Sequence, residues 1–521
     1  MADVDPELHR PDTLPGVGYP FAATRGAGRG SRSVSRGNGA LELDVANQAV
    51  EAALRAGADY ADARVGHETS ESLTVRNQEM EGIDRSDSKG LGIRVLREGR
   101  WGFAATARLD DAEIERTAAL AVRIAEAAGR LPGDRVELAQ AEPATGTWQS
   151  PLRQDPFNVS LEEKVSLLME ATRRMQQVRG VAFAEGGIDL YRSRVWFASS
   201  EGAATEQTVV QSGAGIEATA LGDGEMQRRS YPNSFRGHIA SAGWEHVAKL
   251  GLVEEAERTG TEAVELLEAK ECPSEVTTLV LDSGQVELQI HESIGHAVEL
   301  DRVLGMEESY AGSSFVRPED RGSLRYASPL VSITADATLP GGLGTFAWDD
   351  EGVPAQRVPI LVDGVFQDFL SSRETAGRIG VPSSGAMRAD GWQNLPLIRM
   401  TNISIEPREG SLADLIGDTK DGIFMATNQS WSIDDHRVNF QFGCEIAWRI
   451  KDGKLTELYR NPNYTGITTE FWGSCDAVGG REDWTLWGTP NCGKGQPGQV
   501  ARVGHGASPA RFRNVRVGVR G

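Results

Sequence analysis

The sequence predicts an α+β protein, in which a mixed helix-and-strand domain precedes a β-rich domain that carries a metal-binding helix. In the first half of the chain, helical periodicity and alternating strand-like segments occur without the regular strand-helix-strand units of a doubly wound sheet. From about residue 328 onward the chain predicts mostly strands and glycine-rich loops. A His-Glu-x-x-x-His string lies in the helix predicted just before that region.

Length and charge exclude several classes of function. The chain has 521 residues, enough for two or more domains with full hydrophobic cores. Its 54 Lys and Arg residues stand against 75 Asp and Glu residues, so the formal net charge is −21. General nucleic-acid binders and proteins that bind anionic membrane surfaces need a basic face. We therefore expect neither nucleic acid nor membrane as a partner.

The cysteines and the N-terminal residues indicate a reducing compartment. Four cysteines in a chain of this length, Cys272, Cys444, Cys475 and Cys492, are too few for a disulfide framework. The N-terminus has no apolar leader, and no run of about 18 apolar residues occurs. We expect a cytoplasmic protein with reduced thiols, each of them a candidate metal ligand or nucleophile.

The first 272 residues predict a flexible tail and one mixed domain. Residues 1–40 form the tail, because their Gly/Ser/Arg tract offers little that can pack. Ser160 and Glu163 have the spacing of a capping box, and Cys272-Pro273 ends the last helix, which places the domain boundary between 41–272 and 273–521. Periodicity predicts helices at about 41–57, 110–128, 160–178 and 244–270, and strands at 60–65, 72–83, 92–106 (as a hairpin) and 181–229.

The string His291-Glu-Ser-Ile-Gly-His296 carries the chemistry, in a helix predicted over 284–304 after a strand at 277–281. Two neutral imidazoles can hold a metal ion, and a carboxylate beside them can take a proton from water. The two histidines are five residues apart, which in a regular α-helix separates them by about 140°. A π-type turn would bring them together, so we predict a distorted helix at 294–295, with Gly295 lowering the cost of the distortion. Two unrelated histidines on an ordinary helix are the alternative.

A catalytic zinc site needs a third protein ligand, and the residues alone leave the choice open. Cys444 lies on the apolar face of a predicted strand, and Cys272 at a helix end, so packing is the expected role of both. Cys475 and Cys492 lie in predicted loops that composition does not separate. The remaining candidates are Glu299, Asp301 and His436.

Three further strings accompany the histidine string: Trp348-Asp-Asp-Glu-Gly-Val-Pro354, Leu395-Pro-Leu-Ile-Arg-Met-Thr-Asn402 and Asn491-Cys-Gly-Lys-Gly-Gln496. In this order, the four strings resemble the TldD/PmbA family of metallopeptidases, in its metal-bearing TldD-like branch. The tail 1–40 and the Trp/Gly-rich stretch 471–487 do not map onto the family.

The resemblance implies that His291, His296 and Cys492 bind Zn²⁺ and that Glu292 is the general base. It also implies an α+β N-terminal domain and a β-rich metallopeptidase domain. Members of the family resemble one another in cutting peptides or unfolded segments inside an enclosed dimer cavity. The expected partner is therefore a second copy of the chain or a metal-lacking PmbA/TldE-like paralogue.

Two other functions remain as alternatives, and several polar residues have simpler expected roles. A scaffold or binding subunit would hold a structural metal with four ligands, and a zinc hydrolase would act on amides other than peptides. Asp349, Asp350 and Glu351 are expected to form a solvated acidic turn. Arg399 and Asn402 are expected to be structural.

Overall fold

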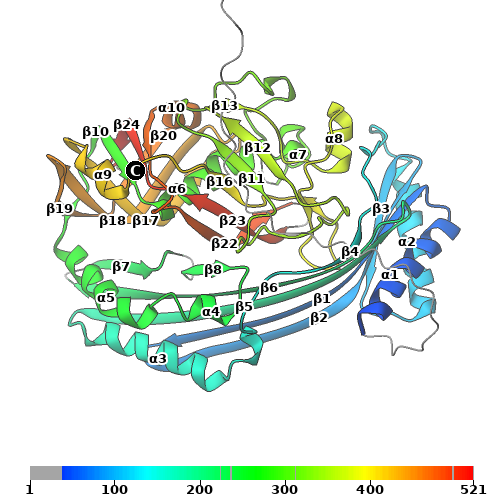
Figure 1. Ribbon diagram of the computed structural model, residues 1–521, viewed down its shortest axis with the longest axis horizontal. Coiled ribbons are helices and arrows are strands. Elements are labelled where there is room, and N and C mark those ends of the chain that lie inside the picture. Colours follow the sequence, from blue (N-terminus) through cyan, green and yellow to red (C-terminus); the bar gives the residue numbers. More distant parts are fainter. Residues whose placement is uncertain (1–37, 223, 235–236, 311, 496–497, 520–521) are drawn as a thin grey trace, which may run out of the picture.

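The computed structural model describes residues 38–222, 224–234, 237–310, 312–495 and 498–519. A long, curved sheet from the first half of the chain extends along one side of the β-rich second half (Figure 1). The predicted α+β class is confirmed. Residues 1–37 of the predicted tail lie outside the described residues, and residues 38–40 belong to the first helix, α1 (Asn38–Arg55).

The curved sheet has the strand order β3-β2-β1-β5-β6-β4, and β7 and β8 also pair with β6. The segments predicted at 60–65 and 72–83 are not separate strands. β1 runs on to Arg76, and a two-residue turn of Asn77 and Gln78, both at positive φ, leads into β2. The alternation of polar and apolar residues continues through this turn, so the sequence pattern did not reveal the turn. The strands are β1 (Tyr60–Arg76), β2 (Glu79–Arg97), β3 (Arg100–Thr106), β4 (Thr145–Gln149), β5 (Val181–Ser199), β6 (Ala204–Gly222), β7 (Glu225–Tyr231) and β8 (His238–Ala240).

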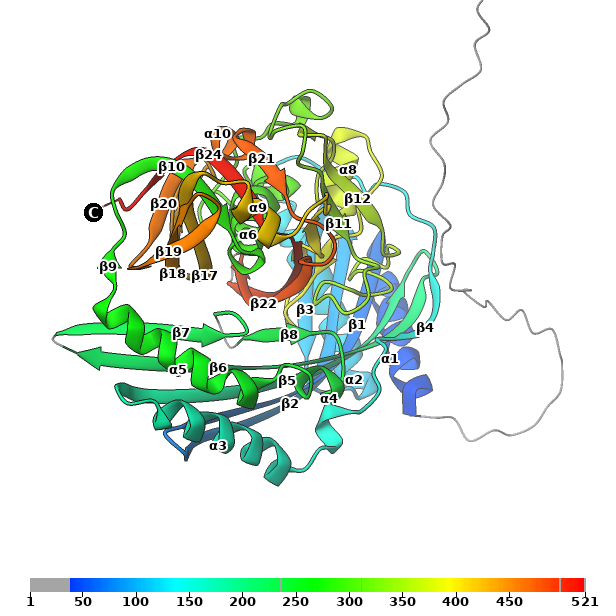
Figure 2. The same cartoon turned by 60° about the vertical axis from the view of Figure 1, so that its left-hand side comes forward.

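Helices pack against this sheet in two groups, each with its own apolar core (Figure 2). α1 packs with α2 (Asp111–Ala128) at one end, and α3 (Leu161–Gln177) with α5 (Leu252–Glu268) at the other. The single helix predicted over 244–270 is wrong, because Gly251 at φ 69° separates α5 from the short α4 (Trp244–Val247).

The predicted capping box at the start of α3 is only half formed. The Ser160 hydroxyl accepts a hydrogen bond from the Glu163 amide at 3.1 Å. The Glu163 carboxylate, however, accepts from the Trp244 indole nitrogen at 3.0 Å. The carboxylate therefore ties α3 to α4 instead of capping its own helix.

The second half of the chain is built on strands that close into a ring. β17 pairs with β10 and with β18, and β10 connects to β18 through β24 and β20, while β19, β9 and β21 extend the sheet. A large apolar core fills this part of the molecule. The strands are β9 (Lys270–Glu271), β10 (Glu275–Leu281), β11 (Ile333–Asp336), β12 (Arg357–Val362), β13 (Val365–Phe366), β14 (Met387–Arg388), β15 (Leu397–Ile398), β16 (Ile403–Ile405), β17 (Asp421–Ile433), β18 (Asn439–Lys451), β19 (Lys454–Arg460), β20 (Asn463–Ile467), β21 (Cys475–Val478), β22 (Thr485–Lys494), β23 (Gln499–Ala507) and β24 (Ala510–Val517).

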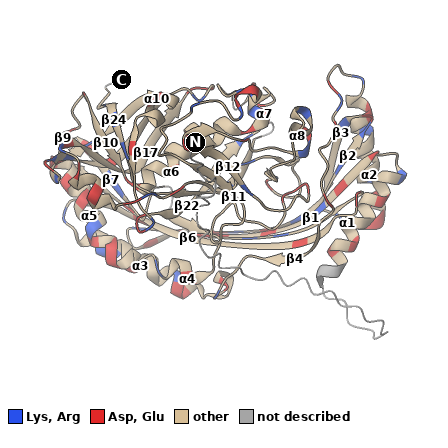
Figure 3. Cartoon of the chain, turned by 45° about the horizontal axis from the view of Figure 1, so that its top comes forward, with Lys and Arg blue, Asp and Glu red and all other residues tan. Residues whose placement is uncertain are grey.

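Short helices connect these strands. Positions of Lys and Arg and of Asp and Glu are interspersed along helices such as α2, α3 and α5 (Figure 3). None of the described helices is both long enough and apolar enough to cross a bilayer. The helices are α6 (Ser283–Ile290), α7 (Leu300–Val303), α8 (Arg373–Ile379), α9 (Leu412–Gly417) and α10 (Thr468–Gly473).

The acidic turn 349–351 joins the curved sheet to the second half of the chain, so its predicted solvated surface position is wrong. Glu351 is buried and pairs with Arg94 of β2 at 3.0 Å, and Arg94 also pairs with Asp62 of β1 at 2.6 Å. Asp349 is buried as well, and it accepts hydrogen bonds from backbone amides of its own turn. Arg94 and backbone amides thus compensate the buried carboxylates of a turn for which composition alone predicts an exposed position.

Replacing Arg94 by Ala is expected to destabilise the fold by about 3–5 kcal/mol, because it leaves two carboxylates buried without their cation. Urea titration followed by tryptophan fluorescence measures this. Arg85→Ala, which removes a largely exposed arginine of β2, is the control and should cost at most about 1 kcal/mol. Equal losses for the two variants would refute the assigned role of Arg94.

Candidate metal centre

The histidine string lies where the helix after β10 changes its geometry. α6 begins with Asp282 as its cap, whose carboxylate accepts from the Gln285 amide at 2.8 Å. At its end, a π-helical turn spans His291–Gly295, in which the His296 amide donates to the His291 carbonyl. A 3-10 turn, His296–Val298, follows. The predicted distortion is confirmed, and the predicted continuous helix 284–304 is wrong.

Ser293 anchors the π turn to its surroundings. Its hydroxyl lies 2.9 Å from the indole nitrogen of Trp472, which donates to it, and its carbonyl accepts from the Tyr326 hydroxyl. All three side chains are buried. Trp472 belongs to the Trp/Gly-rich stretch 471–487, to which no role was assigned from the sequence, and this contact shows that the stretch supports the helix that carries the histidines.

Gly295 is needed because a larger side chain would clash with its surroundings, and not because its backbone is flexible. The expectation that glycine lowers the cost of the distortion is therefore corrected. Its φ of −53° and ψ of −56° are ordinary right-handed helical values. A Cβ built at this position would lie 2.1 Å from Sδ of Met400. The string Leu395–Asn402 therefore packs directly against the histidine string, which gives a physical reason for both.

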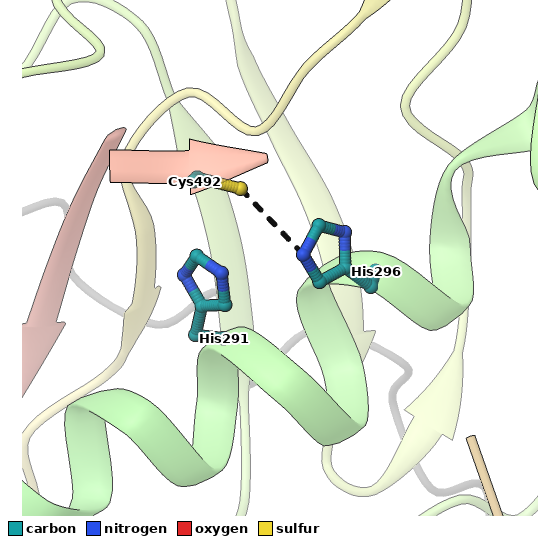
Figure 4. A group of neighbouring side chains, drawn as sticks. All are labelled: His291, His296 and Cys492. Carbon is teal, nitrogen blue, oxygen red and sulfur yellow. Dashed lines mark hydrogen bonds between the residues drawn. The ribbon is translucent and has the colours of Figure 1, made fainter. Parts of the chain in front are cut away.

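The π turn brings three potential metal ligands together (Figure 4). Both imidazoles project from the helix toward β22, which carries Cys492, and one ligand atom from each of the three residues lies within 4.8 Å of the others. Cys492 Sγ is 3.6 Å from His296 Nε2. Tetrahedral zinc would place such a sulfur and nitrogen about 3.6 Å apart, so the donor set fits the ion with shifts of about 1 Å at most.

Hydrogen bonds to the outer ring nitrogens orient both imidazoles. His505 Nδ1 lies 3.3 Å from the Ile403 carbonyl and therefore carries the proton, which leaves its Nε2 to accept from His291 Nδ1 at 2.8 Å. His296 Nδ1 donates to Glu299 at 2.9 Å. In both histidines Nε2 is thus left as a lone pair for a metal. Burial lowers the pKa of His291 and lowers that of His505 strongly, which favours the neutral form of each ring.

Two other third-ligand candidates, Glu299 and Asp301, support the site instead of joining the cluster. Glu299 is fully buried and lies 3.3 Å from the Lys494 ammonium, which also donates to Asp301 at 2.8 Å. Burial alone would raise the pKa of Glu299, but Lys494 and His296 hold it well below its ordinary value. Lys494 is two residues beyond Cys492 on the same strand, so both side chains point inward.

The four thiols differ in environment. Burial raises the pKa of Cys272 and Cys475 to about 12 and holds that of Cys444 well above its ordinary value. Burial acts on Cys492 as well, but His296 and Arg399 outweigh it and leave the thiol pKa below its ordinary value, which favours a thiolate. Cys444 and Cys272 are core thiols as predicted, and Cys475 lies on a strand and bonds to the Ala477 carbonyl.

Other sequence candidates fall outside the cluster. His436 is exposed and bonds to Ser313. Cys492 itself lies on a strand with an irregularity before it, not in the predicted loop. Arg399 donates to the Cys492 carbonyl, and Asn402 bonds to Gly344 and Thr345, in agreement with their structural interpretation.

Glu292 faces a cavity of about 400 Å³ that the three candidate ligands also line. Arg437, from the turn between β17 and β18, donates to Glu292 at 2.7 Å. Burial alone would raise the pKa of Glu292, but His291, His296 and Arg437 lower it below its ordinary value. Glu292 is therefore an ionised carboxylate beside the candidate ligands.

Sequence reasoning missed His505, Lys494, Arg437 and Trp472. The spacing of two from Cys492 could have indicated Lys494, because alternate residues of a strand share a face. No local pattern indicates the other three, since each approaches from a distant part of the chain.

The fold and the site define a protein with a candidate three-ligand metal centre in a β-rich second half, and comparison with known proteins supports this class. Family models of the PmbA/TldA metallopeptidases match residues 61–125 (domain 1), 154–271 (central domain) and 274–519 (C-terminal domain). The chain belongs to this family, which is the TldD/PmbA family of the resemblance.

Curated relatives cover nearly the whole chain. A metalloprotease of Methanothermobacter thermautotrophicus is 30% identical over 88% of this chain and 95% of its own. A metalloprotease of Methanocaldococcus jannaschii is 29% identical over 89% and 97%. A protein of Saccharolobus solfataricus named a zinc metalloprotease TldD homolog is 21% identical over 90% and 98%. The crystal structure of TldE from Thermococcus kodakarensis shares the fold, with a TM-score of 0.69, 16% identity, and coverage of 91% of this chain and 99% of that one.

Substituting Ala for Gly295 is expected to destabilise the protein by about 1–3 kcal/mol, because Met400 occupies the space. Thermal unfolding of the variant measures this. Gly417→Ala, at a helical position with open space, is the control and should be near neutral. The double variant Gly295→Ala/Met400→Ala should lose less than the sum of its single variants, and strict additivity would contradict the packing explanation.

His505→Ala is expected to weaken metal binding by about 10–100-fold, because His291 loses the acceptor that fixes its tautomer. Chelator-competition titration measures the affinity. His505→Gln, whose amide oxygen can accept the same hydrogen bond, should keep more of the affinity than His505→Ala. Unchanged affinity in His505→Ala would exclude the orienting role.

Proposed function

We propose that this chain is a zinc-dependent metallopeptidase that cuts peptides or unfolded segments in an enclosed cavity. Zn²⁺ would be held by His291, His296 and Cys492, with Glu292 as general base. One observation carries the proposal: three suitable donor atoms and an ionised carboxylate meet at one cavity. The names of the curated relatives, all metalloproteases and one a zinc metalloprotease, support it.

The bound metal would polarise the scissile carbonyl and acidify a water molecule. Glu292 would accept a proton from the attacking water and return it to the amine that leaves when the peptide bond breaks. Arg437 keeps Glu292 ionised before the substrate enters. His505 and Glu299 hold the two imidazoles in the tautomer that binds the metal.

The alternative of a structural metal in a scaffold subunit requires a fourth ligand. Among the residues that the structure describes, no other His, Cys, Asp or Glu side chain joins the cluster. An open position is typical of a catalytic site. A zinc hydrolase of non-peptide amides would fit the same donors, and the choice of substrates in the assay separates it from a peptidase.

We further propose a cytoplasmic dimer, formed with a second copy or with a metal-lacking PmbA/TldE-like paralogue. Light scattering of the purified chain, with and without a paralogue from the same genome, tests the assembly. A monomer under both conditions would refute it.

Glu292→Gln is expected to keep the metal and to lose about 10²–10⁴-fold in the rate of peptide cleavage, because the general base is removed. Metal analysis together with digestion of an unfolded peptide measures both quantities. Cys492→Ala should lose metal, whereas Cys475→Ala is the matched control and should keep both metal and activity. Normal cleavage by Glu292→Gln would overturn the assignment of the base.

A further inference from the structure

Glu287 is a buried carboxylate in the metal-site cavity that the proposed mechanism does not use. It lies on α6 four residues before His291, so both side chains occupy the same face of the helix. The residue is 7% exposed and lines the cavity together with His291, Glu292 and Cys492. Its carboxylate therefore points into the space that a substrate would enter.

Within the part of the chain that the structure describes, Glu287 differs from Glu292 and Glu299 in having no cationic partner. Glu292 pairs with Arg437, and Glu299 with Lys494. Glu287 accepts a hydrogen bond from the Thr489 hydroxyl at 3.3 Å, but no described Lys or Arg residue forms an ion pair with it. A buried carboxylate without a cation is costly, and burial raises the pKa of Glu287 to about 7. A cationic group that enters the cavity beside Glu287 would favour the ionised carboxylate and gain a charge-assisted hydrogen bond.

A second cavity, which is also lined by carboxylates, adjoins the metal-site cavity. This cavity, of about 190 Å³, shares Asn233, Ser234 and Gly237 with the first, so the two are neighbours. Among the described residues, three carboxylates and one arginine line it, namely Glu185, Glu217, Glu445 and Arg228. Two of the carboxylates also have a cation outside the cavity, because Glu185 pairs with Arg76 and Glu445 with Arg229. Glu217 lies 3.7 Å from Arg228, and burial raises its pKa to about 6, so it is the least tightly paired carboxylate of this wall.

We propose that Glu287 is a specificity-determining residue that selects peptides carrying a positively charged group next to the bond that is cut. The group is an ammonium or guanidinium, supplied either by the free N-terminus of a peptide or by a Lys or Arg side chain. The proposal rests on the peptidase function proposed above and adds a substrate class to it. Thr489 fixes the carboxylate through its hydroxyl.

The test uses unfolded peptides that differ in one charge, namely Lys against norleucine at one position and a free against an acetylated N-terminus. Cleavage is measured with the metal-loaded full chain, and binding of the same labelled peptides is measured by fluorescence anisotropy after chelator treatment. Mass spectrometry of the products places the charge relative to the cut bond and separates the two sources of charge.

The wild type is expected to prefer at least one of the two cationic peptides by about 10-fold or more in kcat/KM and in affinity. Glu287→Gln should remove this preference while its metal content and its cleavage of the neutral peptides stay within about twofold. Glu287→Asp keeps the charge and should keep most of the preference. Glu217→Gln, which removes a charge from the adjoining cavity, should shift the preference by less than Glu287→Gln does.

Three results would overturn the proposal: no charge preference in the wild type, an equal shift in Glu217→Gln, or loss of metal from Glu287→Gln with equal losses for all peptides. The last result would make Glu287 a counter-charge of the metal. If the metal-loaded chain cleaves no peptide while binding still depends on charge and on Glu287, the peptidase function fails and the cationic subsite stands. Binding and cleavage thus separate the two proposals.

Discussion

The whole site depends on one backbone hydrogen bond, from the His296 amide to the His291 carbonyl. In a regular α-helix these imidazoles would diverge by about 140°, and no side-chain rearrangement could bring both to one ion. The longer turn makes them converge, and the protein stabilises it from outside the helix. Ser293 bonds to Trp472, and Met400 packs against the bare backbone at Gly295. Residues far apart in sequence thus converge on one helical turn.

Much of the site was predictable because its signals are local. The spacing of His291 and His296 fixes an angle, and that angle requires a distorted helix. The surroundings were not predictable, since His505, Arg437 and Trp472 reach the site from other elements. The fold shows the same division. The limits of α1, α2 and α3 followed from periodicity and caps, whereas the helices predicted over 244–270 and 284–304 are interrupted. The long β1–β2 hairpin was missed, because alternation continues through its tight turn.

Around the candidate ligands, a buried carboxylate is as a rule paired with a cationic side chain. Glu292 and Glu299 each have a cation, so both remain ionised although they are buried. In the acidic turn 349–351, Glu351 obeys the same rule through Arg94. Asp349 does not, because its carboxyl group is buried against backbone amides and burial raises its pKa well above the ordinary value. Glu287 breaks the rule among the described residues of the site. Burial raises the pKa of Glu287 to about 7, and the cationic group proposed above as its ligand would supply the missing charge.

The order of the ligands along the chain sets the time at which the site can form. His291 and His296 precede Cys492 by about 200 residues of sequence. β24 (Ala510–Val517) lies between β10 and β20 in the ring and follows all three candidate ligands in the sequence. During synthesis the two histidines therefore emerge long before the thiolate and before the strand that closes the ring. Until Cys492 and β24 have been made, the chain cannot present all three candidate ligands to a metal within a closed ring.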